Sequence, residues 1–151
     1  MAFAVCCRFF LTMYHYRDTY LHITESEVAK NELIVCKGPC FAIVWGGAAN
    51  GKCQAKTYYE ALEVAERAKA LALFKRLADH GKIFDETKFR QETKNLFAFK
   101  PQPRRFFCFF VKGRRVIVVS AYHKQGDKAP PQEITRAEKL RSECLKRIQD
   151  D

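Results

Sequence analysis

The sequence has 151 residues, of which 48% are hydrophobic and 29% charged, and its formal net charge is +10. This length suits one domain with its own core, and the composition excludes a chain that is disordered over most of its length. The charge favours a polyanionic partner, such as nucleic acid, an anionic membrane surface or an acidic protein. Residues 1–50 hold four basic and four acidic residues, so the whole excess lies in residues 51–151.

Seven cysteines are spaced irregularly and form no C-x-x-C pair, which argues against a secreted disulfide framework. A four-sulfur zinc site could in principle use Cys6, Cys7, Cys36 and Cys40, but adjacent cysteines fit the usual ligand spacing poorly. We therefore expect reduced thiols, a cytoplasmic location, and no metal or small-molecule cofactor. The sequence has no apolar run of about 18 residues, so no membrane span is expected.

The first half of the chain predicts an extension, a strand and two helices. Residues 1–40 show no clear periodicity and are interpreted as an N-terminal extension to a domain at 41–151. Phe41–Trp45 is rich in β-forming residues and is followed by two glycines, which predicts a strand and a turn. Apolar residues at helical spacing follow over residues 54–80, with a break expected near Leu62–Glu66 and a stop at Gly81. The polar residues 82–93 predict no more than a short turn of helix.

The second half predicts a three-stranded antiparallel meander and a last helix. Residues 95–100 form the first strand, and Pro101 and Pro103 force an extended corner after it. Residues 105–111 are a continuous apolar run, typical of a strand covered on both faces. A tight turn at residues 112–113 leads to an antiparallel strand over residues 114–122, and the last helix covers 132–148. The fold class is therefore α+β.

Basic residues gather at one edge of this predicted sheet. The start of the strand from 105 lies beside the end of the strand from 114, because the two run antiparallel. The short proline corner brings the end of the preceding strand to the same place. The side chains expected to converge are Lys100, Arg104, Arg105, Tyr122, His123 and Lys124.

Such a group of side chains fits RNA cleavage without a metal. That reaction needs a base for the 2′-hydroxyl proton, cations to hold the charge that builds on phosphorus, and an acid for the leaving oxygen. His123 is the usual type of proton carrier near neutral pH, and fixed Lys and Arg supply electrostatic stabilisation. A desolvated Lys beside other cations is a second candidate base. The alternative is that these residues are merely a solvated basic surface and that His123 is a loop residue.

Several segments resemble the RelE/ParE toxin superfamily, and most closely its HigB-like, phage-derived branch. The resemblance runs from Phe41 to about Cys144 and is carried by four pieces: AKALALFKRLADHG at 68–81, LFAFK at 96–100, PRRFFCFF at 103–110, and VIVVSAYHKQGDKAPPQEI at 116–134. It implies a small RelE-like domain made of a strand, two helices, a three-stranded meander and a C-terminal helix. Residues 1–40 match nothing in the family, and Gln125 stands where many relatives have a lysine.

The resemblance also implies site residues and a function. Lys100 matches the basic residue that ends the family's second strand, Arg105 the arginine that faces the scissile phosphate, and Tyr122 the family's aromatic residue. Lys124 and Lys128 match the basic residues after the last strand, whereas His123 falls where this branch is often apolar. Lys100, Arg105, Tyr122, His123 and Lys124 make the expected catalytic set. The residues assigned to RNA binding are Arg104, Arg114, Arg115 and Lys128.

The implied function is the toxin of a type II toxin–antitoxin system. Such a toxin is a ribosome-dependent mRNA endoribonuclease, and its partners are mRNA on the ribosome and a helix-turn-helix antitoxin. Two alternatives stay open. One is inhibition of DNA gyrase, as in ParE-like toxins, and the other is a non-toxic, phage-derived binding protein with the same fold.

Overall fold

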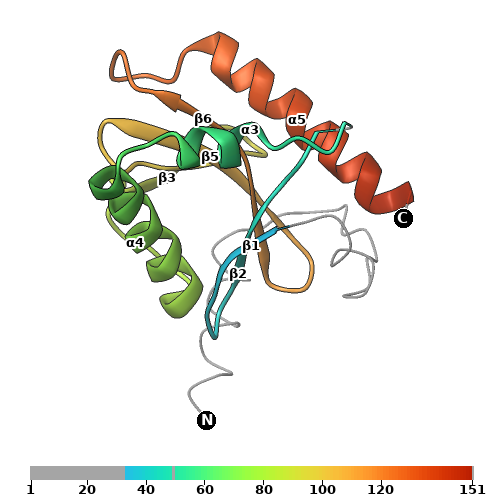
Figure 1. Ribbon diagram of the computed structural model, residues 1–151, viewed down its shortest axis with the longest axis horizontal. Helices are drawn as coiled ribbons and strands as arrows, with labels where there is room; N and C mark the ends of the chain where they lie inside the picture. Colours follow the sequence, from blue (N-terminus) through green and yellow to red (C-terminus); the bar gives the residue numbers. More distant parts are fainter. Residues whose placement is uncertain (1–32, 49, 151) are drawn as a thin grey trace.

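The computed structural model of the protein describes residues 33–48 and 50–150. This part of the chain contains six strands and three helices (Figure 1). In chain order they are β1 (Leu33–Lys37), β2 (Ala42–Trp45), α3 (Gln54–Glu60), α4 (Val64–His80), β3 (Phe89–Gln91), β4 (Phe97–Phe99), β5 (Arg104–Val111), β6 (Arg115–His123) and α5 (Pro131–Asp150).

All six strands belong to one sheet, in the order β1-β2-β6-β5-β4-β3. The pair formed by β2 and β6 is parallel, and every other pair is antiparallel. A parallel pair needs a long crossover connection. Here α3, α4 and the meander from β3 to β5 supply it, so β6 lies in the middle of the sheet although it is the last strand of the chain.

The expected mixed α+β class is confirmed, but the expected number of strands was wrong. The meander of β4, β5 and β6 extends at one edge by β3, where a turn of helix was expected. Only Phe89 of this strand is buried, so its three residues carry no alternating pattern that would signal a strand. At the other edge, Leu33–Lys37 pairs with β2, so the sheet begins within the stretch interpreted as an extension. Residues 1–32 lie outside the described part of the chain.

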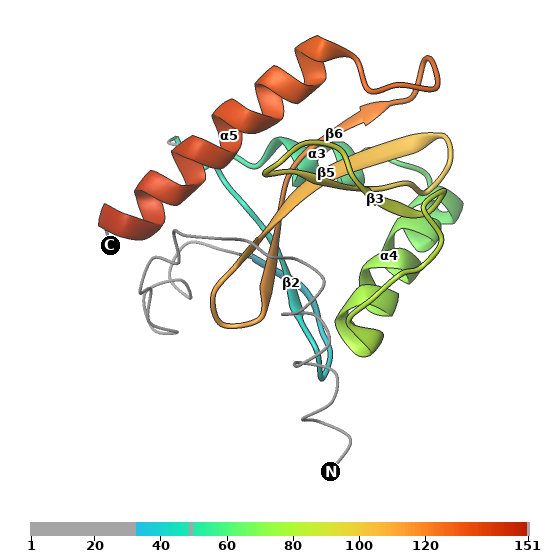
Figure 2. The same ribbon diagram turned by 180° about the vertical axis from the view of Figure 1, so that it is seen from behind.

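Two helices cover one face of the sheet and one helix covers the other (Figures 1 and 2). On the face of α3 and α4, Phe74 and Leu77 pack among Phe99, Phe106 and Trp45. On the α5 face the apolar contacts form two clusters, one around Cys144 and Ile148 and the other around Ala137. The apolar run of β5 is buried on both faces, as its lack of alternation predicts.

The boundaries of the two helices follow from local chemistry. The expected break is confirmed, because α3 ends at Glu60 and α4 begins at Val64. Gly81 ends α4 in the left-handed region with φ of 72° and donates its N–H to the carbonyl of Leu77 at 2.8 Å. A residue with a Cβ adopts that conformation at a cost, which explains the glycine at this position.

Candidate functional site

The end of the β5–β6 hairpin brings together four of the residues expected to converge. Arg104 pairs with His123, and Arg105 pairs with Tyr122. The backbone N–H of Lys124 continues the ladder by donating to the carbonyl of Pro103 at 2.9 Å. The antiparallel register predicted from the sequence is therefore present at this end of the sheet.

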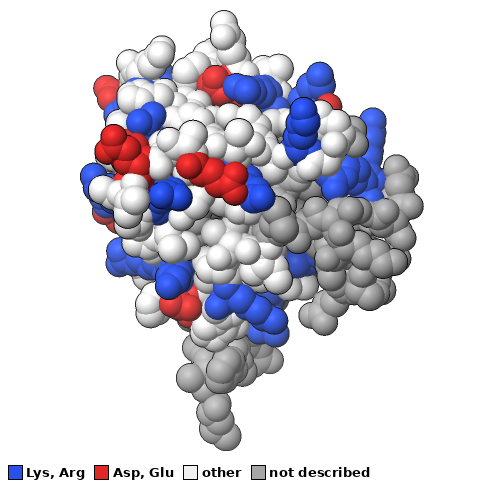
Figure 3. All heavy atoms as spheres, viewed as in Figure 1, with Lys and Arg blue, Asp and Glu red and all other residues white. Residues whose placement is uncertain are grey.

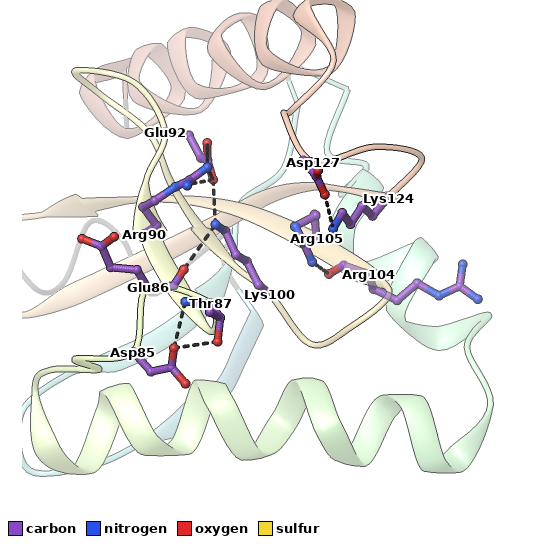
Figure 4. A network of polar contacts seen from close by, with 10 residues as sticks. All are labelled: Asp85, Glu86, Thr87, Arg90, Glu92, Lys100, Arg104, Arg105, Lys124 and Asp127. Atoms are coloured by element: carbon purple, nitrogen blue, oxygen red, sulfur yellow. Dashed lines mark hydrogen bonds and ion pairs between the residues drawn. The ribbon is translucent and has the colours of Figure 1, made fainter.

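The two pairs nevertheless lie on opposite faces, since successive residues of a strand point to opposite sides. Arg104 contacts Tyr58 and Glu66, which belong to α3 and α4. Tyr122 packs in the cluster on the α5 side and stacks on Phe107, with ring centroids 5.5 Å apart. Figure 4 shows the guanidinium of Arg104 pointing away from Arg105. The expected single constellation is thus two separate groups.

The group on the α5 face centres on Lys100, which follows β4 and is only 6% exposed. Its Nζ lies 3.3 Å from the Oε1 of Glu92 and donates to the carbonyl of Glu86 at 3.3 Å. Glu92 in turn binds the guanidinium of Arg90 at 3.1 Å (Figure 4). An ammonium has three N–H donors, so these two contacts leave one for a ligand.

A short turn fixes the carbonyl that Lys100 contacts. The Oδ1 of Asp85 accepts hydrogen bonds from the backbone N–H of Thr87 at 2.9 Å and from its hydroxyl at 2.6 Å. These bonds lower the pKa of Asp85 and hold residues 85–87 in a turn. Lys100 also donates its backbone N–H to Lys88 at 2.8 Å, so the lysine is anchored by its main chain as well as by its amine.

Arg105 and Tyr122 complete this group. Arg105 is 6% exposed and donates from Nη1 to its neighbour's carbonyl, that of Arg104, at 3.0 Å. That contact uses one of its five N–H donors. Tyr122 is 8% exposed and lies directly opposite on β6. We name Lys100, Arg105, Tyr122 and Glu92, together with the exposed Arg90 that binds Glu92, the buried cationic group.

Burial sets the protonation behaviour of this group. It lowers the pKa of Lys100, and the charge of Glu92 opposes only part of that effect. It likewise lowers the pKa of Arg105, and it raises the pKa of Tyr122 despite the nearby positive charge of Arg105. Lys100 is thus easier to deprotonate than an exposed lysine, and Tyr122 is harder to ionise than an exposed tyrosine.

Glu92 and Arg90 were missed from the sequence. They lie at and just after β3, within the polar stretch interpreted as a turn of helix. The contact of Glu92 with Lys100 depends on the pairing of β3 with β4, which no local pattern signals. The charge of each residue was visible in the sequence, but its neighbours were not.

Gln54 positions the end of β6 that carries Tyr122. Strand β2 leaves β6 after the N–H of Gly46 donates to Val118. Three residues further on, the amide of Gln54 takes over, because its Nε2 donates to the carbonyl of Ala121 at 2.9 Å and its Oε1 accepts from the N–H of Ala121 at 2.7 Å. A side-chain amide thereby replaces a missing strand neighbour.

The remaining predicted residues are divided between the two ends of the hairpin. Lys124 binds Asp127 at 3.3 Å near Arg105 (Figure 4), and Lys128 is exposed in the loop before α5. Arg114 and Arg115 lie at the opposite end, where Val111 pairs with Arg115. The basic side chains visible in Figure 3 are likewise in several groups with acidic side chains among them. The structure therefore does not bring Arg114 and Arg115 to the buried cationic group.

Two further features bear on ligands and surroundings. Within residues 33–48 and 50–150, no group of three or more His, Cys, Asp or Glu side chains is placed to hold a metal ion. The four-cysteine zinc site considered above includes Cys6 and Cys7, which lie outside the described residues. None of the helices described is both long and apolar enough to cross a membrane.

Comparison with known families bears directly on this region. Residues 57–142 match the model of the phage-derived Gp49-like proteins, a family that carries the designation DUF891. The match covers more than half of the chain and includes every residue of the buried cationic group. The chain belongs to the Gp49-like family. No curated protein matches it significantly.

Proposed function

We propose that this Gp49-like protein is the toxin of a type II toxin–antitoxin system and acts as a ribosome-dependent, metal-independent mRNA endoribonuclease. The family is one of RelE-like toxins, which supports the assignment to toxins. The observation that carries the proposal of RNA cleavage is the pairing of Arg105 with Tyr122 beside the buried amine of Lys100. A cation, a buried amine and a proton donor are held there on β5, just after β4 and on β6.

The proposed reaction uses each of the three side chains in one role. The 2′-oxygen attacks phosphorus and gives its proton to Lys100 in its neutral form, which burial makes easier to reach than in an exposed lysine. Arg105 holds the non-bridging oxygens as negative charge builds on them. Tyr122 gives its proton to the 5′-oxygen as the bond from phosphorus to that oxygen breaks. The products are a 2′,3′-cyclic phosphate and a 5′-hydroxyl. Lys100 then loses its proton to solvent and the Tyr122 phenolate takes one up, which restores the starting state.

The overall charge supports binding of this protein to the ribosome. The net charge is +10, and residues 94–128 contain nine basic residues and one acid. Positive charge raises the rate and strength of association with RNA. This location of the target implies action in the cytoplasm.

Induced expression tests the proposal. Translation should stop, and mapping of RNA ends should show mRNA cut within translated codons, with cutting by the purified protein dependent on ribosomes and unaffected by EDTA. Lys100→Ala and Arg105→Ala should each lose about 10²–10³ in cleavage rate. Arg136→Ala, at an exposed position of α5 that has no assigned role, is the matched control. Equal toxicity of all three variants would contradict the proposed site.

Other outcomes would indicate the alternative functions. A DNA-damage response with intact mRNA would indicate inhibition of gyrase, and normal growth would indicate a non-toxic binding protein. The proposed antitoxin is a small helix-turn-helix protein that covers the basic end of the sheet. Co-expression of such a protein from an adjoining gene should restore growth, and the two chains should purify together.

A further inference from the structure

His123 lies outside the buried cationic group and has a close partner of its own. Its Nδ1 is 2.7 Å from the Nη1 of Arg104, on the face of the sheet that α3 and α4 cover. The two residues are directly opposite each other on β5 and β6. His123 is exposed at the end of β6, so the rest of its ring faces solvent.

Arg104 is itself held in place by two further residues. Its Nε donates to Glu66 at 3.0 Å, and its Nη1 donates to the hydroxyl of Tyr58 at 2.9 Å. The guanidinium also lies 5.8 Å from the centre of the Tyr58 ring. Glu66 is in the first turn of α4 and Tyr58 is on α3, so two helices fix the position of Arg104.

The chemistry of arginine decides the state of the imidazole. A guanidinium only donates hydrogen bonds and does not lose its proton in proteins. The Nδ1 of His123 must therefore accept from Arg104, which places the single ring proton on Nε2. An imidazolium would set an N–H against the guanidinium, so the contact also requires the neutral ring.

We propose that Arg104 is a positioning residue that fixes His123 as the neutral Nε2–H tautomer, and that His123 donates this hydrogen bond to a backbone phosphate of bound RNA. The second part rests on the proposed function. A neutral ring that already carries a proton on its exposed nitrogen is a hydrogen-bond donor, not a base. Proton transfer falls to the opposite face, where Lys100 and Tyr122 lie.

Nitrogen NMR tests the tautomer without reference to any activity. In protein labelled with 15N-histidine at a pH of about 8, where imidazoles are mostly neutral, the His123 ring should carry its proton on Nε2 alone. Arg104→Met should convert this state into a mixture of tautomers, whereas Arg104→Lys, which keeps a donor, and Arg114→Met, a remote control, should retain it. A proton on Nδ1 in the unmodified protein overturns the proposal even if Arg104→Met fails to fold. A spectrum unchanged in folded Arg104→Met also overturns it.

Kinetics with RNA test the role of the donor. His123→Ala should raise KM and leave kcat unchanged within about twofold, because a contact made equally in the ground and transition states affects only binding. His123→Gln, which keeps an N–H near the same place, should restore KM. A fall in kcat of about 10²–10⁴ in both variants would show that His123 transfers a proton, which overturns the proposal. If the unmodified protein cuts no RNA, the proposed function fails separately, and unchanged affinity of His123→Ala for single-stranded RNA would overturn the donor role.

Discussion

The Nζ of Lys100 and the Oε1 of Glu92 form an ion pair of 3.3 Å in which the two side chains are only 7% and 10% exposed. Both residues follow strands at the β3 edge of the sheet, and neither lies in a helix. Removal of one charge from such a pair leaves the other buried without its partner. The pair therefore contributes to the stability of this edge, and its lysine is also the base proposed for RNA cleavage.

Glu92→Gln should lower the free energy of unfolding by about 3–5 kcal/mol, because it leaves the Lys100 ammonium buried without its counter-charge. Equilibrium unfolding in urea measures the loss. Glu60→Gln is the matched control, since Glu60 forms an exposed pair with Lys56 at 3.5 Å and should cost less than about 0.5 kcal/mol. Equal losses of unfolding free energy in the two variants would show that burial does not strengthen the effect of removing one charge from the Lys100–Glu92 pair.

The stability conferred by Tyr122 should depend on alkaline pH. Burial raises the pKa of Tyr122 in the folded protein, so the unfolded chain ionises first, near pH 10. The contribution of Tyr122 is therefore complete below about pH 10 and is lost as the pH rises through its folded value. Urea unfolding of the unmodified protein and of Tyr122→Phe should give a stability difference that shrinks over that range. A constant difference would show that the phenol is not perturbed.

Gln54→Ala should destabilise the protein by about 1–3 kcal/mol, because both polar groups of Ala121 lose their partner at the end of β6. Amide hydrogen exchange at Ala121 should accelerate in the same variant. Gln91→Ala serves as the comparison, as that side chain is exposed and makes a single 3.4 Å bond to Lys94. It should change stability by no more than about 0.5 kcal/mol.

Gly81→Ala should cost about 1–2 kcal/mol, since the residue that ends α4 has φ of 72° and a Cβ is strained there. Thermal or urea unfolding measures this effect. Gly126→Ala places its Cβ in open space and should be close to neutral. A neutral result at residue 81 would mean that α4 ends differently in solution.

The salt dependence of RNA binding should change when a phosphate contact is lost. For single-stranded RNA, log K falls with log salt by about 0.7 for each phosphate neutralised. Arg105→Ala should reduce the magnitude of the slope by about that amount. Arg136→Ala, an exposed α5 residue paired with Glu133, should leave the slope unchanged. If Arg105→Ala also leaves the slope unchanged, Arg105 does not contact phosphate.

The sequence predicted elements whose pattern is long or strongly apolar. The two helices, the break between them and the β5–β6 hairpin all have such patterns, and the structure contains each of them. The edge strands β1 and β3 were not predicted, because they are short and partly exposed. Such a strand forms through its pairing with a neighbouring strand and has no clear pattern of its own. The expected α+β class did not depend on them.

The candidate site was predicted only in part, for two different reasons. The pairing of Arg105 with Tyr122 follows from the hairpin register, which the sequence indicates. The separation of Arg104 from Arg105 onto opposite faces was also implied, because adjacent strand residues alternate, but the expected convergence overlooked it. The contact of Glu92 with Lys100 could not be predicted from the sequence, since it depends on the pairing of β3 with β4.

The register of the hairpin also sets a minimum length for any ligand that contacts both of its basic ends. Arg115 begins β6 and His123 ends it, with Arg104 opposite the latter. A strand advances about 3.4 Å per residue, so these ends are roughly 27 Å apart. A mononucleotide can occupy one end alone, whereas a polymer that contacts both must bridge that whole length. Oligonucleotides of increasing length would therefore show a second increment in affinity only once they reach across the hairpin.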